Sequence, residues 1–130
     1  MSGETDLQRL LTALRPCLSQ TAYAFAVVTN ADEIPAGTTI LATFAEDEGL
    51  TIIGPFDELV WPGLERSGPW AKISFGVHSS FFAVGLTAKV TSVLSDYGIS
   101  ANVIAAFFHD HIFVPWEERH TALEALKKLG

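Results

Sequence analysis

The chain has 130 residues, of which 48% are hydrophobic, and a formal net charge of −7. This length allows one domain or two small lobes with a real core, and the negative charge argues against nucleic acid or an anionic membrane surface as a partner. No apolar run reaches the roughly 18 residues of a membrane span, and no signal peptide is visible at the N-terminus. The single cysteine, Cys17, excludes an internal disulfide and is interpreted as a packing residue at a helix end. We expect a soluble cytoplasmic protein.

A first helix is predicted near the N-terminus by four leucines with helical spacing, Leu7, Leu10, Leu11 and Leu14. Thr5 and Gln8 fit a capping box at its start, and Pro16 ends it. The aromatic, β-rich segment from Tyr23 to Thr29 is then predicted to be a strand in the middle of a sheet.

A hairpin follows the polar turn of residues 30–37. Thr39 to Ala45 alternates between apolar and other residues, and Leu50 to Ile53 returns as its partner strand. Between them, Gly49 can supply the positive φ of a tight turn.

The segment from Pro55 to Pro69 holds the densest cluster of Pro and Gly in the chain. We therefore place the boundary between two lobes there, with a short helix around Phe56 to Val60. A new strand is expected from Ala71 to Val77.

The second half predicts a helix, because five residues form one apolar stripe: Leu86, Val90, Val93, Leu94 and Tyr97. Gly98 closes this helix. Ala101 to Phe108 is a nearly unbroken apolar run and is interpreted as a buried strand, which turns at His109–Asp110–His111 into a strand from Ile112 to Val114. A closing helix follows Trp116.

Two segments of the chain resemble a known family: residues 42–53, ATFAEDEGLTII, and residues 84–115, VGLTAKVTSVLSDYGISANVIAAFFHDHIFVP. They are similar to small bacterial proteins of uncharacterised function that contain two ACT-like domains, and more distantly to the ACT domains of the CASTOR arginine sensors. The resemblance implies an α+β fold of two ACT-like (ferredoxin-like) lobes, with an antiparallel sheet and helices packed on one face. We expect an abbreviated first lobe in residues 1–68 and a second lobe in residues 69–130.

A ligand site is predicted where the Ala71 strand leads into the following helix. Unpaired N–H groups at a helix start suit a carboxylate, and Ser79 or Ser80 could donate to it while Gly85 allows close approach. The alternative is that Ser80 only caps the helix and Gly85 only permits tight packing. The resemblance places the ligand contacts of this corner at six residues: His78, Ser79, Ser80, Val84, Gly85 and Leu86.

Three further residues are candidates for ligand contacts. Asn102 starts the presumed buried strand, where its amide needs a partner. Asp110 matches by motif an aspartate that recognises the basic end of the ligand in the arginine sensors, and the resemblance adds Glu48. The alternatives are that Asp110 makes the hairpin turn and that Glu48 belongs to a solvated turn.

The histidines allow a different interpretation. His78, His109 and His111 could gather at one end of the sheet and bind zinc, but no spacing enforces this, so we predict half-buried histidines that hold the turn and no metal or cofactor. His120 is expected at the surface of the last helix.

These observations favour a non-catalytic module that binds an amino acid and has a regulatory role. No nucleotide-binding, triad or CxxC motif is present, so we do not expect an enzyme. A homodimer is expected, since an edge strand and three tryptophans, Trp61, Trp70 and Trp116, can lie at seams between lobes or subunits. The alternatives are a structural or partner-binding module without a ligand, and a small metal-dependent enzyme that uses the three histidines.

Overall fold

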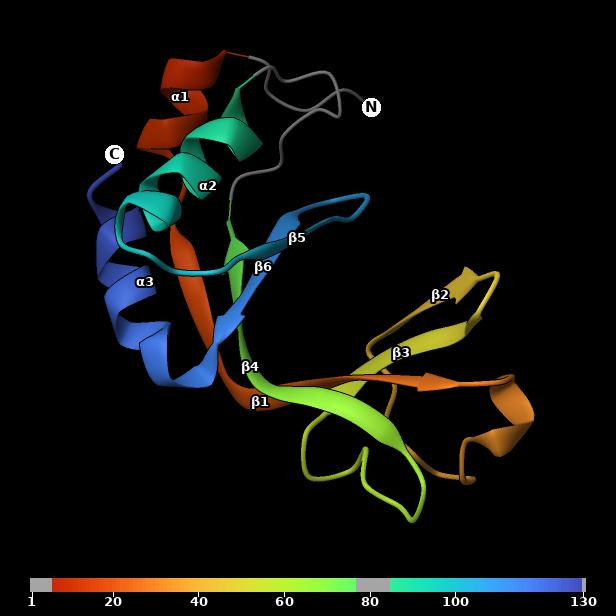
Figure 1. Cartoon of the computed structure of the whole chain (residues 1–130). Helices are drawn as coiled ribbons and strands as arrows, with labels where there is room; N and C mark the ends of the chain where they lie inside the picture. Colours follow the sequence, from red (N-terminus) through yellow and green to blue (C-terminus); the bar gives the residue numbers. More distant parts are fainter. Residues whose placement is uncertain (1–5, 77–84, 130) are drawn as a thin grey trace. The chain divides into compact units, whose positions relative to one another are not determined.

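The computed structural model describes residues 6–76 and 85–129 and has an α+β architecture (Figure 1). Six strands are hydrogen-bonded in the order β2-β3-β1-β4-β6-β5. The chain divides into two compact units, one made of residues 20–70 and the other of residues 1–19 and 71–130. Strand β1 (Pro16–Val28) and strand β4 (Glu65–Phe75) each contribute residues to both units.

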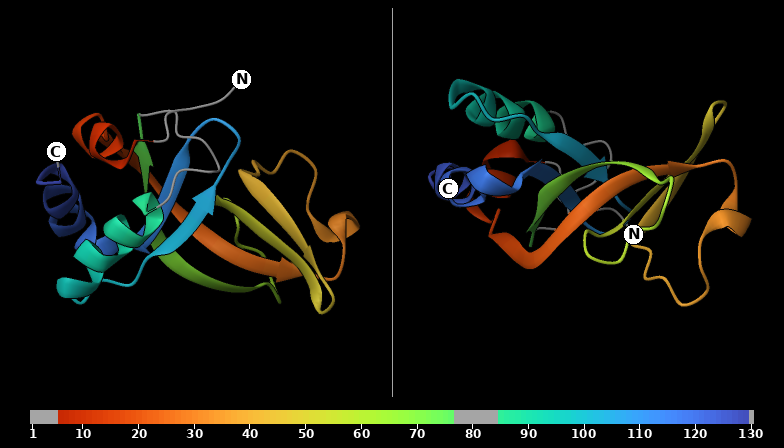
Figure 2. Two further views of the ribbon diagram at one scale, coloured as in Figure 1. Left: turned by 90° about the horizontal axis from the view of Figure 1, so that it is seen from above. Right: turned by 60° about the horizontal axis from the view of Figure 1, so that its bottom comes forward.

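The unit formed by residues 1–19 and 71–130, called the helical unit below, contains three α-helices in its described part. These are α1 (Leu7–Thr12), α2 (Leu86–Asp96) and α3 (Arg119–Lys127), and they lie on one side of the strands of this unit (Figures 1 and 2). Strands β5 (Asn102–Ala105) and β6 (Asp110–Pro115) form an antiparallel hairpin, followed by the short 3-10 helix η2 (Trp116–Glu118). The predicted arrangement of helices on one face is therefore confirmed.

Helix α2 confirms most of the predicted apolar stripe. Leu86, Val90 and Leu94 are buried in the core of the helical unit, and Gly98 has a φ of +71°, as expected for a residue that ends a helix. Tyr97 is an exception, because it lies past the last helical residue and is 50% exposed. The N-cap of the described helix is Gly85, without a side-chain hydrogen bond, and Ser80, the cap predicted as the alternative, lies outside the described residues.

The hairpin that follows departs from the prediction of one long buried strand. Strand β5 ends at Ala105, and the N–H of Ala106 donates to the carbonyl of His109 at 3.0 Å, which closes a turn before β6 starts at Asp110. Phe107 and Phe108 stand in this turn and are 67% and 58% exposed. Hydropathy alone could not locate this turn, because the apolar run continues through it.

The N-terminal helix is shorter than its leucine pattern and has a different cap. Asp6, not the predicted Thr5–Gln8 box, is the N-cap, and its carboxylate accepts from the N–H of Gln8 at 2.9 Å. Helix α1 ends at Thr12, whereas Pro16 begins β1 instead of ending the helix. Cys17 is therefore an exposed strand residue, which corrects its assignment to a helix end. In α3, His120 is exposed as predicted.

The unit formed by residues 20–70, called the strand unit below, has no α-helix. Strand β3 (Gly49–Pro55) lies between β1 and β2 (Ala42–Glu46) and is antiparallel to both. The pairing of β2 with β3 confirms the predicted hairpin, and the position of β1 between β3 and β4 confirms the predicted central strand. The two-residue turn between β2 and β3 follows from the pairing of Glu46 with Gly49. The 3-10 helix η1 (Ala31–Glu33) follows the end of β1 (Figure 2).

The strand unit corrects one further prediction. Residues 56–60 form no helix; the N–H groups of Glu58 and Leu59 donate to the carbonyl of Pro55, both at 3.0 Å, and make a single turn. Leu59 is nonetheless fully buried in a small core with Ala24, Ala26, Val28 and Ile52. The lobe boundary at residues 68 and 69 stays a prediction. In the described part of the chain, no helix has both the length and the apolar character needed to cross a membrane.

Candidate functional site

The predicted strand–helix corner lies largely outside the described residues, which leave out His78, Ser79, Ser80 and Val84. Gly85 has a φ of +92°, and a side chain there would meet Leu7 Cδ2 at 3.2 Å from its Cβ. Both observations account for glycine at this position through backbone and packing. Leu86 is 3% exposed and packs in the core of the helical unit.

Asn102 and Asp110 lie at opposite ends of the β5–β6 ladder. Asn102 pairs with Phe113 and Asp110 with Ala105, three residue steps apart, which corresponds to about 10 Å along the strands. Asn102 is exposed on the edge strand β5, so the prediction that it starts a buried strand is wrong. Asp110 starts β6 and is half-buried. The structure therefore does not bring these two side chains together at one point.

His111 is held by a neighbouring strand. Its Nδ1 lies 2.7 Å from the hydroxyl of Ser74 on β4. Burial lowers the pKa of His111, and the positive charges of Lys72 and His109 lower it further, while Asp110 opposes the change. His109 is exposed at the turn. Within residues 6–76 and 85–129, no three His, Cys, Asp or Glu side chains form a group that could hold a metal ion.

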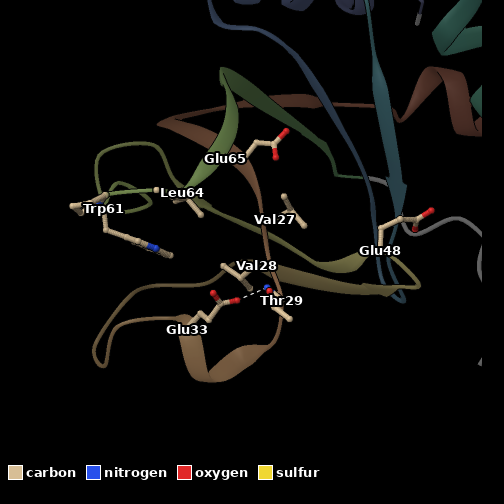
Figure 3. A pocket seen from close by; sticks show the side chains of 10 residues that line it. Val27, Val28, Thr29, Glu33, Glu48, Trp61, Leu64 and Glu65 are labelled. Carbon is tan, nitrogen blue, oxygen red and sulfur yellow. Dashed lines mark hydrogen bonds between the residues drawn. The ribbon is translucent and has the colours of Figure 1, made fainter.

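The strand unit contains an open pocket with a volume of about 430 Å³ (Figure 3). Four parts of the chain form it: the end of β1 and the residue after it, the last residue of η1, the turn between β2 and β3, and the loop that leads into β4. Its lining residues are Val27, Val28, Thr29, Glu33, Glu48, Trp61, Pro62, Gly63, Leu64 and Glu65. Of the residues predicted to contact a ligand, this pocket includes Glu48.

One wall of the pocket is a tight turn between Trp61 and Leu64. The N–H of Leu64 donates to the carbonyl of Trp61 at 3.1 Å, and Gly63 has a φ of +84°. Pro62 followed by a glycine with positive φ is the sequence of a type II turn. The turn places the half-buried Trp61 on the side of the pocket opposite Glu48 in the view of Figure 3.

A second wall is fixed by a carboxylate. Glu33 accepts a short hydrogen bond from the N–H of Thr29, drawn as a dashed line in Figure 3. This hydrogen bond lowers the pKa of Glu33, because it stabilises the ionised carboxylate. Asn30 caps the same short helix by accepting from the N–H of Asp32 at 2.9 Å. Hydrogen bonds therefore hold the segment that follows β1 in place where it borders the pocket.

Arg66 supports the loop that precedes the Trp61 turn. Its Nη1 donates to the carbonyls of Phe56 at 2.7 Å and Leu59 at 2.9 Å, and its guanidinium carbon lies 3.9 Å from the centre of the Phe56 ring. Planar guanidinium groups suit such combined hydrogen bonding and stacking. Arg66 thus holds residues 56–59 against β4 and positions the turn that follows.

The charge of the pocket is negative. Glu33, Glu48 and Glu65 are exposed and line it, and the described lining residues include no Lys, Arg, His or Cys. Such an arrangement can attract a cation, and the indole of Trp61 adds a surface that suits an organic cation.

Sequence reasoning reached this pocket only through Glu48. It assigned Trp61 to a seam and did not select Glu33 or Glu65. The available signal was the Trp61–Leu64 turn sequence, WPGL, within a breaker-rich segment between two strands. The sequence could not show that this turn faces the end of β1.

Comparisons with known proteins agree with this architecture. Structural neighbours of the chain are α+β, ferredoxin-like regulatory modules, and models of the ACT domain match residues 2–69 and residues 65–128. The chain belongs to the ACT-domain family, which confirms the resemblance of the two sequence segments. ACT domains are typically regulatory modules that bind small molecules.

Three solved structures illustrate the relationship. A Vibrio cholerae protein of unknown function, described as a possible transport protein, is 41% identical, with 96% of each chain covered and a TM-score of 0.84. A protein from Agrobacterium tumefaciens is 23% identical, with 90% of this chain and 89% of that chain covered and a TM-score of 0.73. The ligand-free regulatory subunit of aspartate kinase from Thermus thermophilus shares the fold at 11% identity, with 91% and 98% covered and a TM-score of 0.68. No curated protein matches the sequence.

Proposed function

We propose that this chain is a non-catalytic regulatory module of the cytoplasm that binds an amino acid and acts as a homodimer. The observation that carries the proposal is the match of both halves of the chain to the ACT domain. The regulatory subunit of aspartate kinase, which has the same fold, supports a role in which the module has no active site of its own.

The proposed amino-acid site is the corner between β4 and α2, where the first N–H groups of α2 can receive a carboxylate. The contacts assigned to it are His78, Ser79, Ser80 and Gly85, with Asp110 as the partner of an amino group. Glu48 belongs to the strand unit and is described with the pocket there.

The test is a thermal-shift screen with the twenty amino acids at millimolar concentration. At least one amino acid is expected to raise the melting temperature, because a ligand that binds only the native state stabilises it. Absence of any shift would contradict the proposal. A double variant, Ser79→Ala with Ser80→Ala, is expected to lose the response.

Gly85→Asp is a stronger variant, since it adds bulk and negative charge at the helix start. It also strains the backbone, so Gly37→Asp is the matched control: Gly37 has a φ of +84° and open space around its Cβ position. We expect Gly85→Asp alone to abolish the shift. Loss of the response in both variants to the same degree would contradict a site at Gly85.

The homodimer has its own test. Light scattering is expected to give about twice the chain mass of 14.1 kDa. A mass of 14.1 kDa at high concentration would contradict self-association.

A second candidate, a partner-binding module without a ligand, is favoured by exposed aromatic side chains. Phe107 and Phe108 form an edge-to-face pair with ring centres 4.9 Å apart at the tip of the β5–β6 hairpin. Exposed apolar groups of this kind are typical of contact surfaces. A pull-down with Phe107→Ser and Phe108→Ser variants distinguishes this candidate, which predicts a bound protein that the double variant no longer retains.

A further inference from the structure

A second hollow of the strand unit adjoins the pocket described above. This hollow has a volume of about 320 Å³ and shares Val27 and Glu65 with the first pocket. The other residues that line it are Phe25, Ala26, Thr51, Arg66 and Ser67. This second hollow, which adjoins the first pocket at Val27 and Glu65, is called the groove below, and its size lies within the range of small-molecule sites.

The strand alternation defines which side chains face this groove. Phe25 and Val27 point to one face of β1, while the intervening Ala26 and the following Val28 are buried in the core on the other face. Thr51 is the register partner of Val27, and Phe44 is the register partner of Thr51, so the three side chains stand in one row on the groove face.

The floor of the groove is apolar and partly exposed. Val27 is 37% exposed, and Phe44 at the end of the row is 71% exposed. Phe25 makes an edge-to-face contact with Trp70, with 6.2 Å between ring centres, and the Trp70 Nε1 donates to the hydroxyl of Ser67 at 3.2 Å. These contacts hold the aromatic floor in place before any ligand arrives.

The charge around this floor has one sign. Glu65 lies where the two hollows meet, and Glu48 and Glu33 line the first pocket. Arg66 borders the second hollow, but its side chain is on the opposite face of β4 from Glu65 and Ser67, bound to the carbonyls of Phe56 and Leu59. Among the described residues, no cationic side chain is therefore aimed at the groove to receive a ligand carboxylate.

We infer that the groove of the strand unit binds a small organic amine: an ammonium group near Glu65 and an apolar body over Val27 and Phe25. An ammonium is attracted by the carboxylates, and the apolar body covers exposed side chains that otherwise contact water. A free amino acid is disfavoured, because its carboxylate would meet further carboxylates. This site is separate from the amino-acid site proposed at the start of α2.

The test is isothermal titration calorimetry of the full chain with three matched probes: 2-phenylethylamine, L-phenylalanine and 3-phenylpropionate. The amine is expected to bind saturably, L-phenylalanine about tenfold more weakly, and 3-phenylpropionate not at all. Binding of the amine should weaken as salt is added. Equal affinity for the amine and for 3-phenylpropionate, or no saturable binding of the amine, would overturn the inference.

Variants locate the site. Glu65→Gln is expected to weaken binding of the amine about fivefold, whereas Glu117→Gln removes the same charge from an exposed position in η2 and should leave affinity unchanged. An equal loss in both variants would show attraction by bulk charge and would overturn the inference. The Gly85→Asp variant should bind the amine normally; if it does not, the groove is not the site.

Discussion

The two units of this chain are stabilised by different interactions. Among the described residues, the main core of the helical unit contains 14 buried side chains, while the core of the strand unit contains five. The strand unit is stabilised in addition by hydrogen bonds, which Arg66 donates to two carbonyls and the N–H of Thr29 donates to the carboxylate of Glu33. It also carries an open pocket and exposed apolar side chains. In the strand unit, a small core is thus combined with an open pocket and with exposed apolar side chains such as Val27 and Phe44.

The same substitution in both cores tests this difference most strongly. Leu94 and Leu59 are each fully buried, one in each unit. Leu94→Ala is expected to lower the free energy of unfolding by about 3–5 kcal/mol, and Leu59→Ala by about 2–3 kcal/mol, because a cavity in the smaller core is filled more easily by neighbours or water. Urea unfolding of both variants measures the two values. A larger loss for Leu59→Ala would show that the strand unit is the more tightly packed.

Loss of the Arg66 hydrogen bonds in the strand unit is expected to give the next largest effect. Arg66→Ala removes two hydrogen bonds to carbonyls and the stacking on Phe56, and should cost about 1–3 kcal/mol. Arg66→Lys keeps the charge but not the planar group, so it is expected to restore only part of the stability. Hydrogen exchange should rise at Glu58 and Leu59, whose N–H groups donate to Pro55. Full recovery of stability and protection with lysine would show that charge alone matters.

In the helical unit, the N-cap of α1 makes a smaller contribution to the free energy of unfolding. Asp6 caps α1 through the N–H groups of Gln8 and Arg9. Asp6→Ala should lower the free energy of unfolding by about 1 kcal/mol, and Asp6→Asn should retain most of it, since an amide oxygen can also accept. Thermal unfolding of the two variants gives the comparison, and equal losses would assign the effect to charge instead of hydrogen bonding.

The extent to which the sequence predicted the structure also differs between the units. The stripe of α2 and the hairpin of β2 and β3 were predictable, because burial imposes a period of 3.6 or 2 on the sequence. The end of β5 was not, since Phe107 and Phe108 continue its apolar run although they are exposed. The pocket was the least predictable feature. Glu33 and Glu65 both line it because β1, which precedes η1, is the neighbour of β4 in the sheet, and no local sequence pattern records that pairing.

The smallest effect concerns pH, and it depends on His111 in the helical unit. Ser74 and Lys72 on β4, and His109 and Asp110 beside it, are the groups that bear on this imidazole. Its pKa is lowered in the folded protein, first by burial and then by the neighbouring positive charges. Between the lowered pKa and the ordinary value of about 6.5, the unfolded chain binds more protons than the folded chain, so stability falls as the pH drops through this window and is retained above it. NMR titration should give His111 a pKa below 6.5, and urea unfolding at pH 7.5 and 5.5 should show a smaller loss for His111→Gln than for the unaltered chain. An identical loss in both proteins would show that groups other than His111 cause the acid sensitivity between pH 7.5 and 5.5.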